Sequence, residues 1–429
     1  MNKRPKPAGH KQTDIASASS RKKSNSSQLN SQMAPSRRTF WMITGCGSVL
    51  VLLVGVGLLA NRWFVDSKVN DLMRDCNQAV KSADWPTLER LARQWAVLEP
   101  ESVKPWTMAA SASRAMGDLG GCAQYLSQLP DSAPVEAFHE LSLLQMESLV
   151  QPLAARDTCV RTLRIYPDDR ESSLRLLFIH SMLCHRDKVV TEVKRAVRAG
   201  ADTRATYAYL FTANWITFAN GSKLNQFWIE QDPENEDFLV AALTHEALYR
   251  VADNTTGGES SRKDSELPEI NLQTRIDGLR SRFPNNIELR MIEMSKHLQA
   301  GQVDRLGELL ESPTDKLKVD NRYWRYQGWF LASHEQWSEA IDAYNRALTL
   351  CPVDFSSQNE LAAILRRTRG PAESQSMQTK ANLGIELELA FLKASNFESV
   401  SQTDYGRLAD YLELCGETDL SNGLRKHLR

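Results

Sequence analysis

Two histidines and a cysteine stand close together in the middle of the chain and could bind a transition metal. His180 and His185 are five residues apart, and Cys184 directly precedes the second. A helix places side chains on one face at spacings of three or four residues, so a spacing of five puts these histidines on different faces. His334 is followed by Glu335 but lacks the second histidine of a zinc-protease helix. We therefore predict no metal site.

The cysteines also lack the spacing of a functional motif. No two are placed as in a zinc knuckle or a redox pair. Cys76, Cys122 and Cys159 fall in apolar helical rows, where a free thiol behaves as a small hydrophobic side chain. A disulfide between Cys122 and Cys159 stays open if the compartment is oxidising. The seven cysteines of the chain are Cys46, Cys76, Cys122, Cys159, Cys184, Cys351 and Cys415.

The residue patterns of common enzyme sites are missing from the sequence. There is no phosphate-binding glycine loop, no G-x-S-x-G elbow and no convincing pair of catalytic acids. The pair Gly120-Gly121 is too short to form a phosphate-binding loop. We therefore expect no catalytic residues, no cofactor and no enzymatic activity.

The most specific pattern in the chain runs from Asn321 to Asp354 and reads NRYWRYQGWFLASHEQWSEAIDAYNRALTLCPVD. Aromatic, small and proline residues recur there at fixed spacings, at Trp324, Gly328, Ala340, Tyr344, Ala347 and Pro352. In these positions the stretch resembles a tetratricopeptide repeat, a hairpin of two antiparallel helices. It departs from the family pattern at Gln327 and Leu331, where the family has Leu and Tyr.

The residue types at these positions suit two closely packed helices. Trp324 and Tyr344 would fill the cleft between the helices, while small residues such as Gly328 let the helix axes approach. Pro352 would end the second helix. One hairpin cannot bury its own apolar face, so several hairpins must stack. The resemblance thus implies an all-α solenoid.

The prolines give an independent measure of the repeat length. Pro100 and Pro134 are 34 residues apart, Pro134 and Pro167 are 33 apart, and Pro284 and Pro352 are 68 apart. A period of about 34 residues predicts about nine or ten helix hairpins, with Gly117 and Gly301 at turns between paired helices. The fold class we predict is therefore a tetratricopeptide-like α-solenoid.

A polar insertion divides the expected repeats into two series. Residues 252–267 are rich in Gly, Ser and charged side chains and lack apolar periodicity, which predicts a loop. N-terminal hairpins are then expected over residues 66–251 and C-terminal hairpins over residues 268–429, with residues 321–354 as the best repeat. A plain linker between two lobes remains an alternative for the insertion.

The first sixty residues differ from the rest. Residues 1–39 carry nine Lys or Arg and one acidic residue, a charge of +8, whereas the remainder carries 43 basic and 52 acidic residues, a charge of −9. The composition of residues 1–39 predicts a disordered basic tail. Residues 41–60 contain no charge, which predicts a transmembrane helix over residues 40–61.

The charges around this segment predict its orientation. Because Arg37 and Arg38 precede it, we expect a single-pass membrane protein with a cytoplasmic N-terminus and an extracytoplasmic body. Arg37-Arg38 also resembles a twin-arginine export signal, in which case the segment could be cleaved. The tail could bind nucleic acid or anionic lipid, but we expect no nucleic-acid partner for the body.

Candidate binding residues lie on the first helix of the best repeat and one repeat further on. The resemblance implies a groove on the inner face of the superhelix that holds extended peptides, and arginine suits the carboxylates of such peptides. The candidate groove residues are Arg322, Arg325, Trp329 and Arg366.

We therefore expect a membrane-anchored scaffold or adaptor that binds partner proteins or extended peptides. Two alternatives remain open. One is an enzyme-associated subunit in which the insertion at residues 252–267 has a role, and the other is a signalling or localisation adaptor that faces the cytoplasm. The sequence specifies neither the partner nor the oligomeric state.

Overall fold

The computed structural model describes residues 37–214, 220–256 and 269–429. Over these residues the chain consists of helices joined by turns and has no strand, which confirms the predicted all-α class. The chain divides into two compact units, Met1–Lys68 and Val69–Arg429, which we describe separately.

Helix α1 spans Arg37–Lys81, a single helix of 45 residues. The apolar run at residues 41–60 therefore does not mark the limits of a separate helix, because the helix continues through charged turns that include Arg62, Asp66 and Lys68. No helix among the described residues is both long and apolar enough to cross a membrane. Our prediction of a transmembrane helix over residues 40–61 is therefore wrong. The predicted localisation, a single-pass membrane protein with a cytoplasmic N-terminus and an extracytoplasmic body, is wrong for the same reason.

Two further predicted segments fall largely outside the described residues. Of the predicted basic tail, residues 1–36 lie outside the described part of the chain, and α1 already begins at Arg37. Of the predicted polar insertion, residues 252–256 belong to helix α11 (Glu236–Thr256) and residues 257–267 lie outside the described part.

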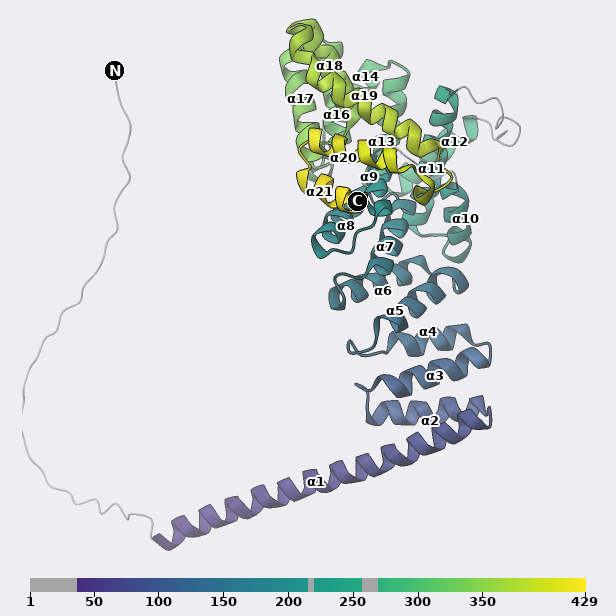
Figure 1. Ribbon diagram of the computed structural model, residues 1–429, viewed down its shortest axis with the longest axis vertical. Coiled ribbons are helices and arrows are strands. Elements are labelled where there is room, and N and C mark those ends of the chain that lie inside the picture. The colour runs from purple at the N-terminus through teal and green to yellow at the C-terminus, as the bar shows by residue number, and fades with distance from the viewer. Residues whose placement is uncertain (1–36, 215–219, 257–268) are drawn as a thin grey trace, which may run out of the picture. The chain divides into compact units, whose positions relative to one another are not determined.

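In the unit from Val69 onward, consecutive helices pack against one another as stacked hairpins (Figure 1). A π-helical turn, η1 (Leu144–Ser148), follows helix α5 (Val135–Leu143). The first helices after α1 are α2 (Trp85–Leu98), α3 (Val103–Ala115), α4 (Leu119–Ser127), α5 (Val135–Leu143), α6 (Pro152–Ile165), α7 (Arg170–Met182) and α8 (Arg186–Ala199). The next are α9 (Arg204–Asn214), α10 (Gly221–Gln231), α11 (Glu236–Thr256), α12 (Glu269–Arg282), α13 (Ile287–Gln299), α14 (Val303–Leu310) and α15 (Asp315–Lys318).

The final helices contain the repeat with the strongest pattern. They are α16 (Asn321–Ser333), α17 (Trp337–Leu350), α18 (Phe355–Thr368), α19 (Pro371–Lys393), the 3-10 turn η2 (Phe397–Ser399), α20 (Gln402–Leu414) and α21 (Thr418–Lys426). The predicted best repeat thus corresponds to the hairpin α16–α17. Pro352 lies in the turn after α17.

Short polar residues and glycines begin and end many of these helices. The side chain of Asp84 accepts a hydrogen bond from the Thr87 backbone N–H at the start of α2, and Asp118 accepts one from the Gly121 N–H at the start of α4. Gly117 and Gly301 have φ angles of 79° and 65° in the turns α3–α4 and α13–α14, as expected for glycines between paired helices.

The hairpin α16–α17 packs through a close contact at Gly328. A Cβ added there would come within 2.8 Å of the Tyr344 ring, which is fully buried. Ala340 and Ala347 are also fully buried on α17. Trp324 is only half-buried, and its indole N–H donates a 2.8 Å hydrogen bond to the Lys318 carbonyl. The small side chains therefore set how closely these two helices approach.

Helices far apart in sequence meet where the C-terminal helices pack on the middle of the chain. Helix α21 contacts α8 and α9 (Figure 1). Helix α7 contacts α8, α9 and α10, and further contacts lead from α10 through the later helices to α21, so this contact closes a circuit that we call the helix ring. One apolar core spans the closure, with Leu177, Val193, Tyr207 and Phe211 on one side and Phe391, Tyr405, Tyr411, Leu412 and Leu424 on the other.

Polar contacts and a glycine accompany the closure of the ring. Lys194 on α8 forms a 2.8 Å ion pair with Glu417, and the His427 imidazole lies 2.7 Å from an Asp202 oxygen that also accepts the Tyr207 hydroxyl. Gly423 on α21 lies so close to Tyr207 that an added Cβ would overlap its hydroxyl. The closure is therefore a specific, tightly packed interface.

Candidate functional site

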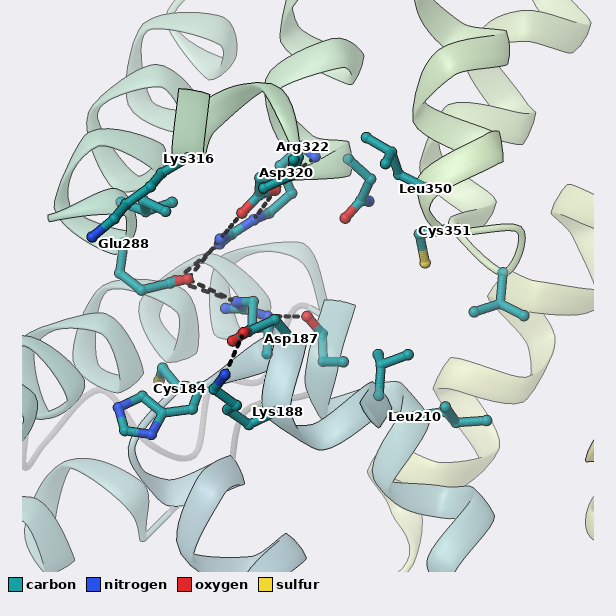
Figure 2. Close-up of a pocket in the computed structure, with 18 of the residues that line it drawn as sticks. Cys184, Asp187, Lys188, Leu210, Glu288, Lys316, Asp320, Arg322, Leu350 and Cys351 are labelled. Atoms are coloured by element: carbon teal, nitrogen blue, oxygen red, sulfur yellow. Dashed lines mark hydrogen bonds and ion pairs between the residues drawn. The ribbon is translucent and has the colours of Figure 1, made fainter. Parts of the chain in front are cut away.

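A pocket of about 750 Å³ lies among the helices of the ring. It is bounded by the first turns of α8, α13, α16 and α21 and by the turn between α17 and α18 (Figure 2). Because Glu288 lies in one of its walls, we call it the Glu288 pocket.

Two arginines from different helices converge on the Glu288 carboxylate. Arg186 Nε donates to its two oxygens at 3.3 and 3.2 Å, and Arg322 donates to them through Nη2 and Nη1 at 2.6 and 2.9 Å. Arg322 also donates to both oxygens of Asp320, at 3.0 and 2.7 Å, and Arg186 donates to the Ala213 carbonyl at 2.7 Å. These contacts tie α8, α13 and α16 together.

The cluster stays charged at neutral pH. The side chains of Arg186, Glu288 and Arg322 are at most 14% exposed. Burial raises the pKa of Glu288, but Arg186 and Arg322 outweigh burial and lower this pKa to about 2. Because both carboxylate oxygens already accept hydrogen bonds from two guanidinium groups, the cluster fixes the wall of the pocket and leaves little capacity to bind a ligand.

The opposite wall of the pocket is apolar. In Figure 2, Leu210, Leu350 and Cys351 lie across the pocket from Glu288. Leu350 keeps 36% of its surface exposed, and Val319 near the polar wall keeps 71%. Such side chains can receive an apolar group of a ligand.

Polar groups with remaining capacity also line the pocket. Asn285 is exposed, and so is Lys316, which has no ion-pair partner among the described residues. Asn286 and Asp320 are occupied, since their side chains accept backbone N–H groups at the starts of α13 and α16. The pocket thus combines apolar surface with an amide and an ammonium group, a lining of the kind found in ligand-binding pockets.

The residues singled out as possible metal ligands have other contacts. His185 Nε2 lies 3.3 Å from Asp237, and the Cys184 thiol lies 3.6 Å from His245 Nε2. In the described part of the chain, no group of three His, Cys, Asp or Glu side chains could hold a metal ion. Burial raises the pKa of Cys184 to about 12, so its thiol is protonated.

Cys122 and Cys159 are free thiols, so they do not form the disulfide that the sequence left open. Both are buried, and burial raises the pKa of Cys159 to about 12.

The four predicted groove residues lie in different environments. Arg322 lines the Glu288 pocket, whereas the other three do not. Arg325 is paired at 2.9 Å with the fully buried Asp354, and Trp329 is partly buried in the core between α13 and α16. Arg366 is exposed on α18. The predicted peptide groove over these four residues stays a prediction, and Arg366 is the one of its three arginines whose replacement breaks no buried ion pair.

Sequence reasoning missed Arg186 and Glu288, although the repeat length carried a signal for them. Arg186 and Glu288 are 102 residues apart, which is three periods of 34, and Glu288 and Arg322 are 34 apart. Residues at the same position of successive repeats can face one another. A search for opposite charges at multiples of 34 residues could therefore have found this cluster.

Comparison with known proteins gives distant likenesses only. No protein-family model matches the chain, and no curated protein matches it. Among solved structures, it is similar to a tetratricopeptide repeat protein from Parabacteroides merdae, with a TM-score of 0.26 and 11% identity over 70% of this chain and 99% of that one. It is also similar to the APC/C hetero-tetramer Cut9–Hcn1, with a TM-score of 0.31 and 11% identity over 84% of this chain and 72% of that one.

A third likeness is to yeast Tom70, with a TM-score of 0.28 and 12% identity over 83% of this chain and 87% of that one. These TM-scores are too low to indicate what this chain binds.

Proposed function

We propose that this protein is an interaction scaffold that seats an extended segment of a partner protein in the Glu288 pocket. The observation that carries the proposal is the division of this pocket into one fixed, charged wall and one apolar wall. The proposal assigns the chain no catalytic activity.

The shape and chemistry of the pocket suit a short peptide. Its volume of about 750 Å³ lies in the range of pockets that enclose a ligand. An apolar side chain of the segment would pack on Leu350 and Val319, while the Asn285 amide could pair with its backbone. Lys316 at the same site favours a carboxylate on the segment.

The fixed wall lowers the entropic cost of binding. Arg186, Glu288 and Arg322 hold one another in place without a ligand, so few side chains need to be ordered when the segment arrives. A pocket organised in advance loses less conformational entropy on binding.

Site-specific photocrosslinking tests this function. A photoreactive amino acid at position 319 should crosslink a partner in cells, whereas the same group at Val160, an exposed apolar position on α6 that does not line the pocket, should not. Mass spectrometry of the product should map the crosslink to one short stretch of the partner.

The affinity of the identified stretch then tests the apolar contacts. Replacing both Val319 and Leu350 by Asp should weaken its binding at least about tenfold, because the apolar side chain of the segment would then meet two carboxylates in place of apolar surface. Equal crosslinking at positions 319 and 160, or unchanged affinity of the double variant, would refute the proposal.

A further inference from the structure

A second hollow lies on the N-terminal hairpins, away from the Glu288 pocket. It has a volume of about 580 Å³ and lies between α2 and α4, beside the start of α3. Arg90, Arg93, Gln94 and Val97 line it from α2, Gln124 lines it from α4, and Gln128 lines it from the position directly after α4. We call this hollow the Arg90 groove. Both α2 and α4 are second helices of their hairpins, whereas the groove predicted from the sequence lies on first helices.

The two arginines of the groove are exposed and three residues apart, so they lie on one face of α2. Neither has an ion pair or a hydrogen bond within the described part of the chain, whereas Arg114 on the adjacent α3 is paired with Glu140. The neighbouring carboxylate, Glu89, instead accepts the Tyr125 hydroxyl at 2.5 Å. The groove thus presents two guanidinium groups that form no ion pair within the described part of the chain.

The rest of the groove offers amides and apolar surface. Gln94, Gln124 and Gln128 are exposed, and a glutamine amide can both donate to and accept from a peptide backbone. Val97 keeps 80% of its surface exposed. The indole N–H of Trp106 donates a 2.9 Å hydrogen bond to the Pro100 carbonyl. Because this N–H is already used, the indole ring offers a ligand apolar contact and no hydrogen-bond donor.

We propose that the Arg90 groove binds an extended, acidic segment of a partner protein. Side chains two residues apart in an extended chain point to the same side about 7 Å apart. Side chains three residues apart on a helix begin about 5–6 Å apart, and arginine side chains are long enough to reach two carboxylates at the slightly larger spacing. Two carboxylates in a Glu-x-Glu arrangement therefore pair with Arg90 and Arg93, the glutamines bind the backbone of the segment, and an apolar side chain packs on Val97.

This surface goes beyond the function proposed for the Glu288 pocket and does not depend on it. Charge complementarity indicates the kind of ligand, because two unpaired guanidinium groups favour carboxylates. One exposed ion pair contributes little binding free energy, but two that form together contribute more.

Fluorescence anisotropy with the full-length protein tests the groove. The probe is a labelled peptide that contains Glu-Leu-Glu, and its control is the same peptide with Gln-Leu-Gln. Replacing Arg90 and Arg93 by Glu should weaken binding of the Glu peptide at least about tenfold, because two attractions become repulsions. The Gln peptide should bind the unchanged protein at least about tenfold more weakly than the Glu peptide.

A matched control is the double variant Arg170→Glu and Arg198→Glu, which changes the net charge equally at two exposed arginines outside the groove. It should change the affinity less than about twofold. Circular dichroism would show that both double variants are folded. An equal loss in both double variants, a failure of the Glu peptide to bind, or tighter binding of a single-stranded DNA oligonucleotide than of the Glu peptide would overturn the proposal.

Discussion

Replacing Glu288 by Gln should reveal how strongly the charge cluster stabilises the helix ring. The two side chains have nearly the same shape, so the change removes one negative charge and little volume. It leaves Arg186 and Arg322 buried with less compensation, and Arg322 then has only Asp320 as a charged partner. Breaking a buried ion pair by removing one partner typically costs about 3–5 kcal/mol.

The pKa of Glu288 gives a second measure of the same effect. It falls from an ordinary value of 4.5 to about 2 in the folded chain, and this difference corresponds to about 3 kcal/mol. Because the pKa is lower in the folded state, the stabilisation is complete above about pH 4.5 and is lost as the pH falls toward 2. The difference in free energy of unfolding between the two proteins should therefore shrink to about half its neutral value near pH 3.

Urea unfolding followed by circular dichroism at several pH values would measure this difference. Glu308→Gln is the control, because Glu308 is 60% exposed and pairs on the surface with Arg305. Its effect should stay below about 1 kcal/mol at every pH. If Glu288→Gln were as stable as the unchanged protein at pH 7, or if the difference did not shrink on acidification, the cluster would not stabilise the ring as argued.

Three further predictions concern the closure and the buried groups. Gly423→Ala should lower stability by about 1–3 kcal/mol, because the added Cβ overlaps the tyrosine opposite; thermal unfolding would check this. Gly406→Ala on α20, where nothing lies within 4 Å, should instead be neutral or stabilising by up to about 1 kcal/mol. Burial lowers the pKa of both His180 and His245 to about 4, so the free energy of unfolding should fall as the pH drops from 6.5 toward 4, and a flat profile would contradict this. The Cys184 thiol should resist alkylation by iodoacetamide at pH 8 until urea unfolds the chain, as read by mass spectrometry.

The local features of the fold could be predicted because they depend on neighbouring residues. The aromatic and small residues between Asn321 and Asp354 specify one hairpin, and α16 and α17 fall within these limits. The turn glycine Gly117 was also found, because a positive φ angle requires little more than the right residue at the right spacing.

The closure of the ring could not be predicted in the same way. Tyr207 and Gly423 are more than two hundred residues apart, and apolar residues on α9 and α21 would look the same if they packed on nearer helices. The Glu288 pocket depends on this closure, because Lys194 and Glu417 reach it from the two sides. A helical pattern indicates which face is apolar but does not indicate which helix covers it.

The prediction of a membrane span went wrong for a related reason. A count of uncharged residues at 41–60 treats that run as an independent helix, whereas α1 is continuous from Arg37 to Lys81. A count of apolar residues does not show where a helix begins or ends, because a helix can continue through charged turns on either side of an apolar run.

The contact between α21 and α8–α9 also affects how the protein unfolds. A row of hairpins whose two ends do not contact each other can unfold one repeat at a time from either terminus. Here the last helices pack on helices about two hundred residues earlier, through the Lys194–Glu417 ion pair and the apolar core around Tyr207. We therefore expect the helix ring, from α7 to α21, to unfold as one cooperative unit, and force applied to the C-terminus must break the contact between α21 and α8–α9 before any single hairpin unfolds.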